Sequence, residues 1–162
     1  MKHLIIGAGE IGQALQKVFK CDIRDIEEIP VKKYDILHIA IPNCVNFVNI
    51  VNDYKKLYKA KYVVVHSTVP VGTCKKGGFI HSPVTGVHPH LAKSLKTFTK
   101  FVSNKKITEE FIKYGIPAVY IKGSNNTEAG KLYALAIYGI NVLLEKEIYK
   151  YCIDNKLNYD VV

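Results

Sequence analysis

A glycine-rich segment near the start of the chain has residue types and spacing suited to binding a phosphate. It consists of Gly7, Ala8, Gly9, Glu10, Ile11 and Gly12, in the pattern G-x-G-x-x-G. The apolar run 3–6 precedes it and helical periodicity follows, so the glycines fall where a strand turns into a helix. The first glycine permits a tight turn, the second lets a pyrophosphate approach helix N–H groups, and the third allows close packing. The pattern predicts a dinucleotide site at residues 7–12.

An acidic residue at the end of the second predicted strand could bind the adenosine ribose of such a dinucleotide. Asp25 lies 18 residues after Gly7. That is close to the spacing of about 20 at which a carboxylate accepts a hydrogen bond from the ribose 2′-hydroxyl. This position predicts NAD as the cofactor. Two alternatives stay open, because Arg24 could instead receive the 2′-phosphate of NADP and Asp22 is a second candidate acid.

The ends of the third and fourth predicted strands should line the same cofactor. Parallel strands end at one edge of a sheet, and ligands of such sheets bind at that edge. We expect the cofactor to contact Ala40, Ile41, Pro42 and Ser67 there. Asn43 is a candidate both for capping the next helix and for touching the dinucleotide.

Four histidines, His66, His81, His88 and His90, gather around the ends of the fourth and fifth predicted strands. Near neutral pH an imidazole can act as a general acid or base, bind an anionic substrate when protonated, or bind a metal. The histidines lack H-x-x-x-H spacing and an acidic partner, so no metal site is expected. The alternative is that they are loop residues without a role. His38, inside the apolar third strand, is interpreted as a hydrogen-bonded core or edge residue rather than a ligand.

Alternating strands and helices must position these residues. The predicted strands are 2–6, 21–24, 35–41, 61–66, 78–81, 100–102 and 118–121, and the predicted helices are 11–19, 45–58 and 108–114. Short β-branched runs that alternate with helical periodicity are typical of a parallel sheet covered by helices. We therefore predict an α/β fold over residues 1–122, a doubly wound and mainly parallel Rossmann sheet.

Residues 123–162 have a different pattern. The turn-forming cluster 123–127 precedes a helical pattern from Glu128 to about Asn155. Such a helix would be on the order of 40 Å long. Its apolar residues are more than one small sheet can cover, so we expect a homodimer through this long C-terminal helix. The alternative is that the helix folds back over its own sheet.

Composition limits the class of protein. The chain has 162 residues and a formal net charge of +9, and its lysines never form a block longer than two. Dispersed charge of this kind is typical of a solvated surface that attracts phosphorylated ligands, so nucleic acid is not expected as a partner. No apolar stretch reaches the roughly 18 residues of a membrane span. The four cysteines lack a C-x-x-C pair and no signal peptide is recognised, so we expect a cytoplasmic protein with reduced thiols.

Three segments resemble one group of enzymes. Residues 67–73 read S-T-V-P-V-G-T, which resembles the S-T-V-P-x-G-T segment of UDP-glucose and UDP-N-acetylmannosamine dehydrogenases. Residues 81–83 lie where those enzymes carry S-P-E-R, and residues 127–131 resemble the A-E-x-x-K that opens their dimerisation helix. The chain resembles the N-terminal domain and first helix of the nucleotide-sugar and 6-phosphogluconate dehydrogenase superfamily, including its hydroxyacid dehydrogenase branch.

The resemblance implies catalytic roles for three residues. Thr68 and Lys131 match positions that in this superfamily orient a water, transfer a proton or stabilise an oxyanion. Residues 86–89 read G-V-H-P, similar to the G-x-H-P of prephenate dehydrogenases, in which a histidine takes the substrate hydroxyl proton. That similarity implies the same role for His88.

The sequence also departs from the superfamily pattern. Leu135 stands where an asparagine usually follows the helix lysine by four residues, and Val84 stands at the glutamate of S-P-E-R. The catalytic cysteine of the nucleotide-sugar enzymes belongs to a C-terminal domain, whereas this chain stops at Val162. Four-electron oxidation of a UDP-sugar is therefore not expected of this chain alone.

The leading hypothesis is an NAD-dependent oxidoreductase that acts on the CH–OH group of a small alcohol, hydroxyacid or sugar-like substrate. Thr68, His81, His88 and Lys131 would surround the reacting carbon. The competing hypothesis is a noncatalytic NAD-binding or ligand-sensing module that kept the cofactor fold. A third is a dimerisation unit inside a larger assembly.

Overall fold

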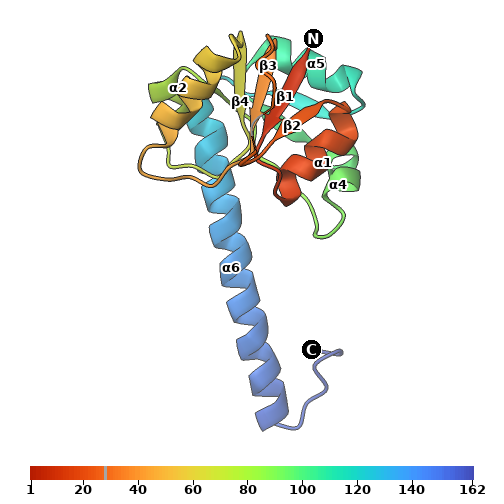
Figure 1. The fold of residues 1–162 in the computed structure, drawn as a ribbon. Helices are drawn as coiled ribbons and strands as arrows, with labels where there is room; N and C mark the ends of the chain where they lie inside the picture. The colour runs from red at the N-terminus through yellow and green to blue at the C-terminus, as the bar shows by residue number, and fades with distance from the viewer. Residues whose placement is uncertain (28) are drawn as a thin grey trace. The chain divides into compact units, whose positions relative to one another are not determined.

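The computed structural model describes residues 1–27 and 29–162 and divides into two compact units. The first unit, Met1–Ala129, contains a sheet with helices on both faces (Figure 1). The second unit, Gly130–Val162, contains most of one long helix.

Five parallel strands form the sheet of the first unit. They are β1 (His3–Ile6), β2 (Asp22–Arg24), β3 (Ile36–Ile39), β4 (Tyr62–Val65) and β5 (Ile80–His81). Their order in space is β2-β1-β3-β4-β5. The direction of winding therefore reverses between β1 and β3. In open α/β sheets, ligands bind outside the carboxyl ends of the strands at such a reversal.

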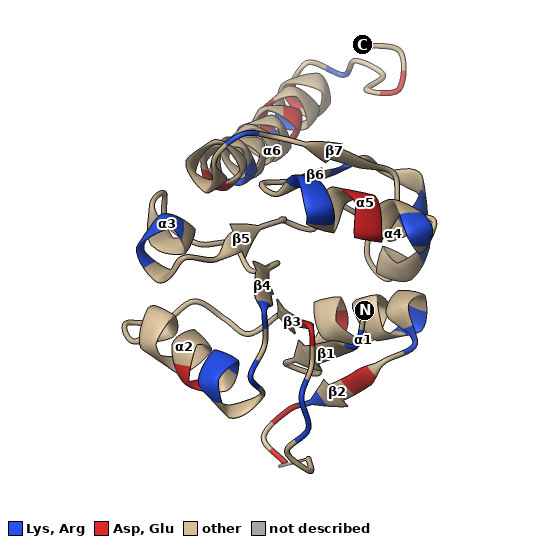
Figure 2. Ribbon diagram, turned by 90° about the horizontal axis from the view of Figure 1, so that it is seen from above, with Lys and Arg blue, Asp and Glu red and all other residues tan. Residues whose placement is uncertain are grey.

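Helices cover both faces of this sheet (Figure 2). On one face lie α1 (Glu10–Phe19), α4 (Leu91–Thr97) and α5 (Lys105–Lys113), and on the other lie α2 (Phe47–Leu57) and α3 (Thr73–Gly77). Neighbouring strand residues alternate between the two cores, since Ile5 clusters with Leu15 and Phe111 whereas Leu4 clusters with Phe47. Burial on both faces explains why the strands are almost continuously apolar. The predicted doubly wound α/β Rossmann fold is confirmed.

A short strand pair continues from the last strand of the sheet. β6 (Lys100–Val102) and β7 (Ala118–Tyr120) pair in parallel. The backbone N–H of Ser103 donates to the carbonyl of His81 at 3.1 Å, and the Ser103 hydroxyl accepts from the His81 N–H at 2.9 Å. These two bonds attach the pair to β5.

Helices α3, α4 and α5 differ from their predictions. α3 and α4 were not predicted, because five and seven residues are too few to show a clear hydrophobic period. α5 begins at Lys105, three residues before the predicted start at 108. Its N-cap is Asn104, whose side chain accepts a hydrogen bond from the Ile107 N–H at 3.1 Å.

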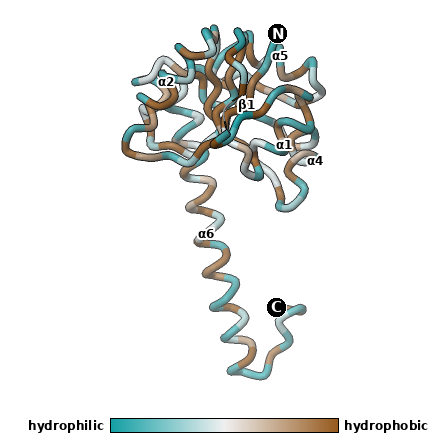
Figure 3. The backbone as a smooth tube through the Cα atoms, in the orientation of Figure 1, coloured by the Kyte–Doolittle hydropathy of each residue, from teal (hydrophilic) through white to brown (hydrophobic). Residues whose placement is uncertain are grey.

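α6 (Ser124–Asp154) is the long C-terminal helix, with 31 residues. It begins four residues before the predicted start at Glu128. Figure 3 shows polar and apolar residues mixed along its length. Within the second unit its large exposed apolar side chains include Tyr133, Ile137, Tyr138, Ile140 and Leu143. Across the described residues, none of the helices combines the length and the apolar character of a membrane span.

Candidate functional site

The glycine turn after β1 has the geometry that its sequence predicts. Gly7 has a φ of +101°, and a Cβ there would lie 2.7 Å from the carbonyl oxygen of Ala40. A Cβ on Gly12 would lie 1.8 Å from the Gly7 carbonyl oxygen, so the helix can approach the turn only without a side chain. A Cβ on Gly9, by contrast, would meet nothing within 4 Å among the described atoms. The backbone at Gly9 is therefore open to a ligand.

The start of α1 offers N–H groups to such a ligand. Gly9 occupies the N-cap position, and no described side chain caps this end of the helix. The first N–H groups of a helix have no acceptor inside the helix, and the helix dipole favours an anion beside them. An open glycine backbone next to uncapped N–H groups fits the pyrophosphate of a dinucleotide.

The ribose side of the site is formed by the end of β2. Arg24, the last residue of β2, pairs with Ile6, and its carbonyl accepts a hydrogen bond from the Gly7 N–H at 2.8 Å. Asp25 follows directly and is exposed. The acid predicted to bind the ribose therefore lies at the carboxyl edge, next to the glycine turn.

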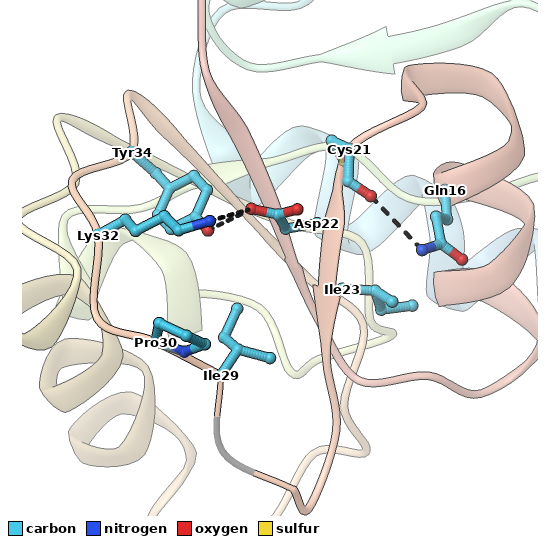
Figure 4. A pocket seen from close by; sticks show the side chains of 8 residues that line it. All are labelled: Gln16, Cys21, Asp22, Ile23, Ile29, Pro30, Lys32 and Tyr34. Atoms are coloured by element: carbon cyan, nitrogen blue, oxygen red, sulfur yellow. Dashed lines mark hydrogen bonds and ion pairs between the residues drawn. The ribbon is translucent and has the colours of Figure 1, made fainter.

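The alternative acid, Asp22, lies near the other end of the same strand. It pairs with Leu4, and its carboxylate accepts a hydrogen bond from the Tyr34 hydroxyl at 2.5 Å. Asp22 lines a separate hollow of about 320 Å³, and the Lys32 ammonium lies 3.9 Å from its carboxylate. Figure 4 shows Lys32 and Tyr34 directed toward Asp22. Asp22 is thus engaged away from the glycine turn, which leaves Asp25 as the ribose candidate.

The Arg24 side chain is buried against α2. Its guanidinium donates to the Tyr58 hydroxyl at 2.7 Å and lies 5.2 Å from the centroid of the Tyr54 ring. Stacking of this kind is one of the preferred environments of a guanidinium. The cation that could receive a 2′-phosphate is therefore occupied by two tyrosines.

The ends of β3 and β4 meet beside the glycine turn. The Ala40 N–H donates to the Ile6 carbonyl at 2.9 Å, and the Ser67 hydroxyl donates to the Ile41 carbonyl at 2.5 Å. Ala40 and Ile41 are half-buried and Pro42 is exposed. The structure therefore brings Ala40, Ile41 and Ser67 together at the predicted edge.

The cap of α2 differs from its prediction. The N-cap residue is Asn46 rather than Asn43, and its side chain makes no capping bond. The segment after β3 runs a few residues further before turning into the helix, so Asn43 stays exposed in the loop.

His81, one of the predicted catalytic residues, is fully buried. Its Nδ1 lies 2.9 Å from the Thr127 hydroxyl and its Nε2 lies 3.3 Å from the Ser67 carbonyl oxygen. The imidazole thus joins the ends of β4 and β5 to the first turns of α6. Thr68, also predicted to be catalytic, is exposed directly after Ser67.

The four predicted histidines have four different surroundings. His88 Nδ1 contacts the Glu10 carboxylate, so this histidine lies over the first turn of α1. His90 occupies the N-cap position of α4. His66 is buried with its Nε2 2.9 Å from the Nδ1 of His38, while His81 contacts the Thr127 hydroxyl. His66 and His81 lie at the ends of β4 and β5, where the sequence predicts them, whereas the loop after β5 carries His88 to Glu10 at the start of α1.

Glu128 is a site residue to which the sequence analysis assigned no role. It is fully buried, and its two carboxylate oxygens accept hydrogen bonds from the N–H groups of Gly72 and Cys74, at 2.7 and 2.8 Å. It therefore holds the segment 67–73 against the start of α6. Its place in the segment 127–131 that resembles A-E-x-x-K was the available signal.

Lys131, the fourth predicted catalytic residue, belongs to the unit Gly130–Val162. Its role stays a prediction. In residues 1–27 and 29–162, no three histidine, cysteine or acidic side chains are grouped so that they could hold a metal ion.

Charge around the site is spread rather than concentrated. Figure 2 shows lysines on α2, α3 and α5, on both sides of the sheet. The general positive field of a chain with a net charge of +9 favours an anionic ligand.

Solved structures share this fold, although no protein-family model and no curated protein matches the chain. An imine reductase from Bacillus cereus BAG3X2 is similar with a TM-score of 0.75 and 12% identity, over 97% of this chain and 67% of that chain. A 3-hydroxyacyl-CoA dehydrogenase from Archaeoglobus fulgidus has a TM-score of 0.64 and 16% identity, over 90% of this chain and 64% of that chain. A reductive aminase from Aspergillus terreus, in complex with NADPH and ethyl levulinate, has a TM-score of 0.62 and 10% identity, over 92% of this chain and 66% of that chain.

These similarities decide the fold. The chain has a Rossmann fold. This chain spans about two thirds of the length of each of the three enzymes. The fold that the sequence resemblance to the 6-phosphogluconate dehydrogenase-like superfamily implies is confirmed.

Proposed function

We propose that the chain binds NAD and acts as an oxidoreductase on the CH–OH group of a small alcohol, hydroxyacid or sugar-like substrate. The observation that carries the proposal is the glycine turn, where Gly7 and Gly12 exclude side chains and Gly9 leaves the helix N–H groups open. Known NAD(P)-dependent enzymes with this fold support it. NAD, when bound, supplies a hydride acceptor.

The residues of this chain would bind the cofactor, position the substrate and transfer its proton. The first turn of α1 binds the pyrophosphate, and Ala40, Ile41 and Ser67 line the cofactor at the ends of β3 and β4. Ser67 is oriented by the Ile41 carbonyl, and Glu128 holds the segment in which Thr68 lies. Thr68 and Lys131 would position and deprotonate the substrate hydroxyl.

The two predicted catalytic histidines receive different roles. His81 has protein oxygens at both ring nitrogens, so it positions the end of β4 rather than taking a substrate proton. His88 contacts Glu10 in the first turn of α1, where the pyrophosphate would bind. A protonated imidazole there would attract the cofactor phosphates.

NAD is favoured over NADP by the charges at the ribose. An exposed carboxylate at Asp25 accepts hydrogen bonds from ribose hydroxyls and repels a 2′-phosphate. The competing cation, Arg24, is buried against Tyr54 and Tyr58. The reductive aminase from Aspergillus terreus contains NADPH, so the choice needs its own test.

Calorimetric titration with NAD, NADH, NADP and NADPH tests the proposal. We expect NAD or NADH to bind more tightly than the phosphorylated forms, and Asp25→Asn to reduce that preference by about tenfold. Asp22→Asn makes the same charge change at the first residue of β2, away from the glycine turn, and should leave the preference unaltered. Stronger binding of NADPH by the unsubstituted protein would reverse the cofactor assignment.

Catalysis is tested separately with a panel of alcohols and hydroxyacids. We expect Lys131→Ala to abolish turnover and keep NAD affinity. Saturable NAD binding without oxidation of any substrate would favour the noncatalytic module, which Leu135 and Val84 already suggest because they replace polar residues of the superfamily.

We also propose a homodimer through α6. The exposed apolar side chains of Gly130–Val162 are the support, since a soluble helix rarely leaves so many uncovered. Sedimentation of the full chain should give twice the monomer mass, and Leu143→Glu, at a side chain that is 64% exposed, should shift it toward monomer.

A further inference from the structure

Three histidines on or directly after three neighbouring strands form a continuous row on one face of the sheet. His3 lies on β1, His38 on β3 and His66 directly after β4, and their side chains face the helices α1 and α5. All three are buried, with exposed fractions of 5%, 0% and 1%. Consecutive rings are stacked, with centroids 5.1 and 5.2 Å apart.

The row makes four contacts through its ring nitrogens. His3 Nε2 lies 3.2 Å from a carboxylate oxygen of Glu110, and His3 Nδ1 lies 2.8 Å from His38 Nε2. His38 Nδ1 lies 2.9 Å from His66 Nε2. His66 Nδ1 lies 2.8 Å from the carbonyl oxygen of Ser82. Every ring nitrogen of the row therefore faces another polar atom at hydrogen-bond distance.

Counting protons along the row reveals a mismatch. Each of the four contacts needs one hydrogen, and neither end can supply it, because a carbonyl and a carboxylate only accept. A neutral imidazole carries one N–H, so three neutral rings supply three hydrogens. One contact then has two lone pairs facing each other. A fourth hydrogen completes all four contacts, and a fifth would make two N–H groups face each other.

We propose that His3, His38 and His66 form one buried proton-binding site, which takes up a single proton for the whole row. The proton sits mainly on His3, beside the Glu110 carboxylate, while the His38 Nδ1–H donates to His66 Nε2 and the His66 Nδ1–H donates to the Ser82 carbonyl. The three histidines therefore titrate as one group. This inference depends on the row alone and not on the proposed dinucleotide binding.

The surroundings of the row favour this placement. Burial lowers the pKa of His38 and His66 well below the ordinary range, and the nearby Lys100 ammonium adds to that effect. At His3 burial also lowers the pKa, but the hydrogen bond to Glu110 and its charge oppose the effect. The end beside Glu110 is thus where a positive ring is least costly.

Glu110 is held in its charged form by its own neighbours. Burial raises the pKa of its carboxyl, but the hydrogen bonds from His3 and from the N-terminal ammonium outweigh burial and lower it. The groups that face the row or Glu110 are the Met1 ammonium, Lys113, Asp35, Tyr114, Lys100 and His81. An ionised Glu110 leaves the extra proton to the imidazoles.

Long-range ¹H–¹⁵N spectra of the ¹⁵N-labelled full chain test the proposal, because they separate protonated from unprotonated ring nitrogens. On acidification of the folded protein, we expect the protonated nitrogens on the three rings to rise from three to four at one shared midpoint. A count that stays at three until unfolding, a count of five in the folded protein, or separate midpoints for the three rings would each overturn it.

The Glu110→Gln variant sharpens the test. A glutamine amide can donate to His3 Nε2 and so supply the fourth hydrogen itself. The count should then stay at three across the folded pH range, with all three rings protonated at Nδ1. Glu109→Gln makes the same charge change at an exposed position of the same helix and should keep the transition from three to four. A transition that persists in Glu110→Gln would contradict the proposal.

Discussion

The glycine turn and the histidine row belong to the same sheet, but the polar groups of the turn are open and those of the row are buried and paired. At the turn, backbone N–H groups at the start of α1 lack a capping side chain, and Gly9 faces open space. In the row, His3, His38 and His66 are buried and every ring nitrogen has a partner. The difference indicates that the turn is built to receive a ligand, whereas the row can receive only a proton.

The largest expected effect comes from a side chain at the closed part of the turn. Gly12→Ala places a Cβ 1.8 Å from the Gly7 carbonyl oxygen, a backbone atom that cannot move aside cheaply. We expect a loss of stability of about 3 kcal/mol or more, the size of severe overpacking. Urea unfolding measures it, and a variant with unchanged stability would show that α1 does not pack so closely on the turn.

The second effect concerns the row and depends on pH. Because the folded pKa values of His38 and His66 are lowered, the unfolded chain binds more protons below its ordinary histidine pKa of about 6.5. Stability is therefore complete above that pH and is lost as the pH falls. If the folded row holds one proton and the unfolded chain three, the loss is about 2.7 kcal/mol per pH unit.

Urea unfolding at a series of pH values between 7 and 5 checks this slope. The variant His90→Gln removes an exposed histidine at the N-cap of α4 and should leave the slope unchanged. Constant stability of the unsubstituted protein over this range would mean that the row is not buried in its neutral form.

A smaller effect distinguishes binding from folding at the turn. Gly9→Ala adds a methyl group where nothing described lies within 4 Å, at an extended backbone with a φ of −65°. We expect stability within about 0.5 kcal/mol of the unsubstituted protein and NAD affinity weaker by about tenfold or more. Calorimetry measures the affinity, and equal affinity for both proteins would show that the pyrophosphate does not approach at Gly9.

The smallest effect is expected at the outer end of the row. Lys113 lies 3.5 Å from Glu110 but is 72% exposed, so its attraction is screened by water. Lys113→Gln should change stability by no more than about 0.5 kcal/mol and should leave the row's proton uptake in place. A larger loss of stability, measured by urea unfolding, would show that Lys113 helps to stabilise the row through Glu110.

The turn could be predicted because its signal is local. Strand, glycines and helix follow one another within 19 residues, and Asp25 needs only the end of the next strand. The long helix from Ser124 was predicted for the same reason, since its apolar pattern continues over many turns. Local rules of this kind are reliable where one segment carries the whole pattern.

The row could not be predicted because its members are distant in sequence. His3 and His38 are 35 residues apart and His38 and His66 are 28 apart, so only the strand order β1-β3-β4 brings them together. His38 was predicted as a bonded core residue, which is confirmed, but its partners were not foreseen. His88 was grouped with His66 and His81 although its loop carries it to Glu10.

The central claim is that the glycine turn can bind a ligand and the buried histidine row cannot. It is tested most directly by NMR during titration of the full chain with NAD. We predict shifts of the backbone N–H signals of residues 8–12 and 25, with no change in the ring signals of His3, His38 and His66. Shifts of the buried rings without shifts at residues 8–12, or no shift at any NAD concentration, would contradict the account.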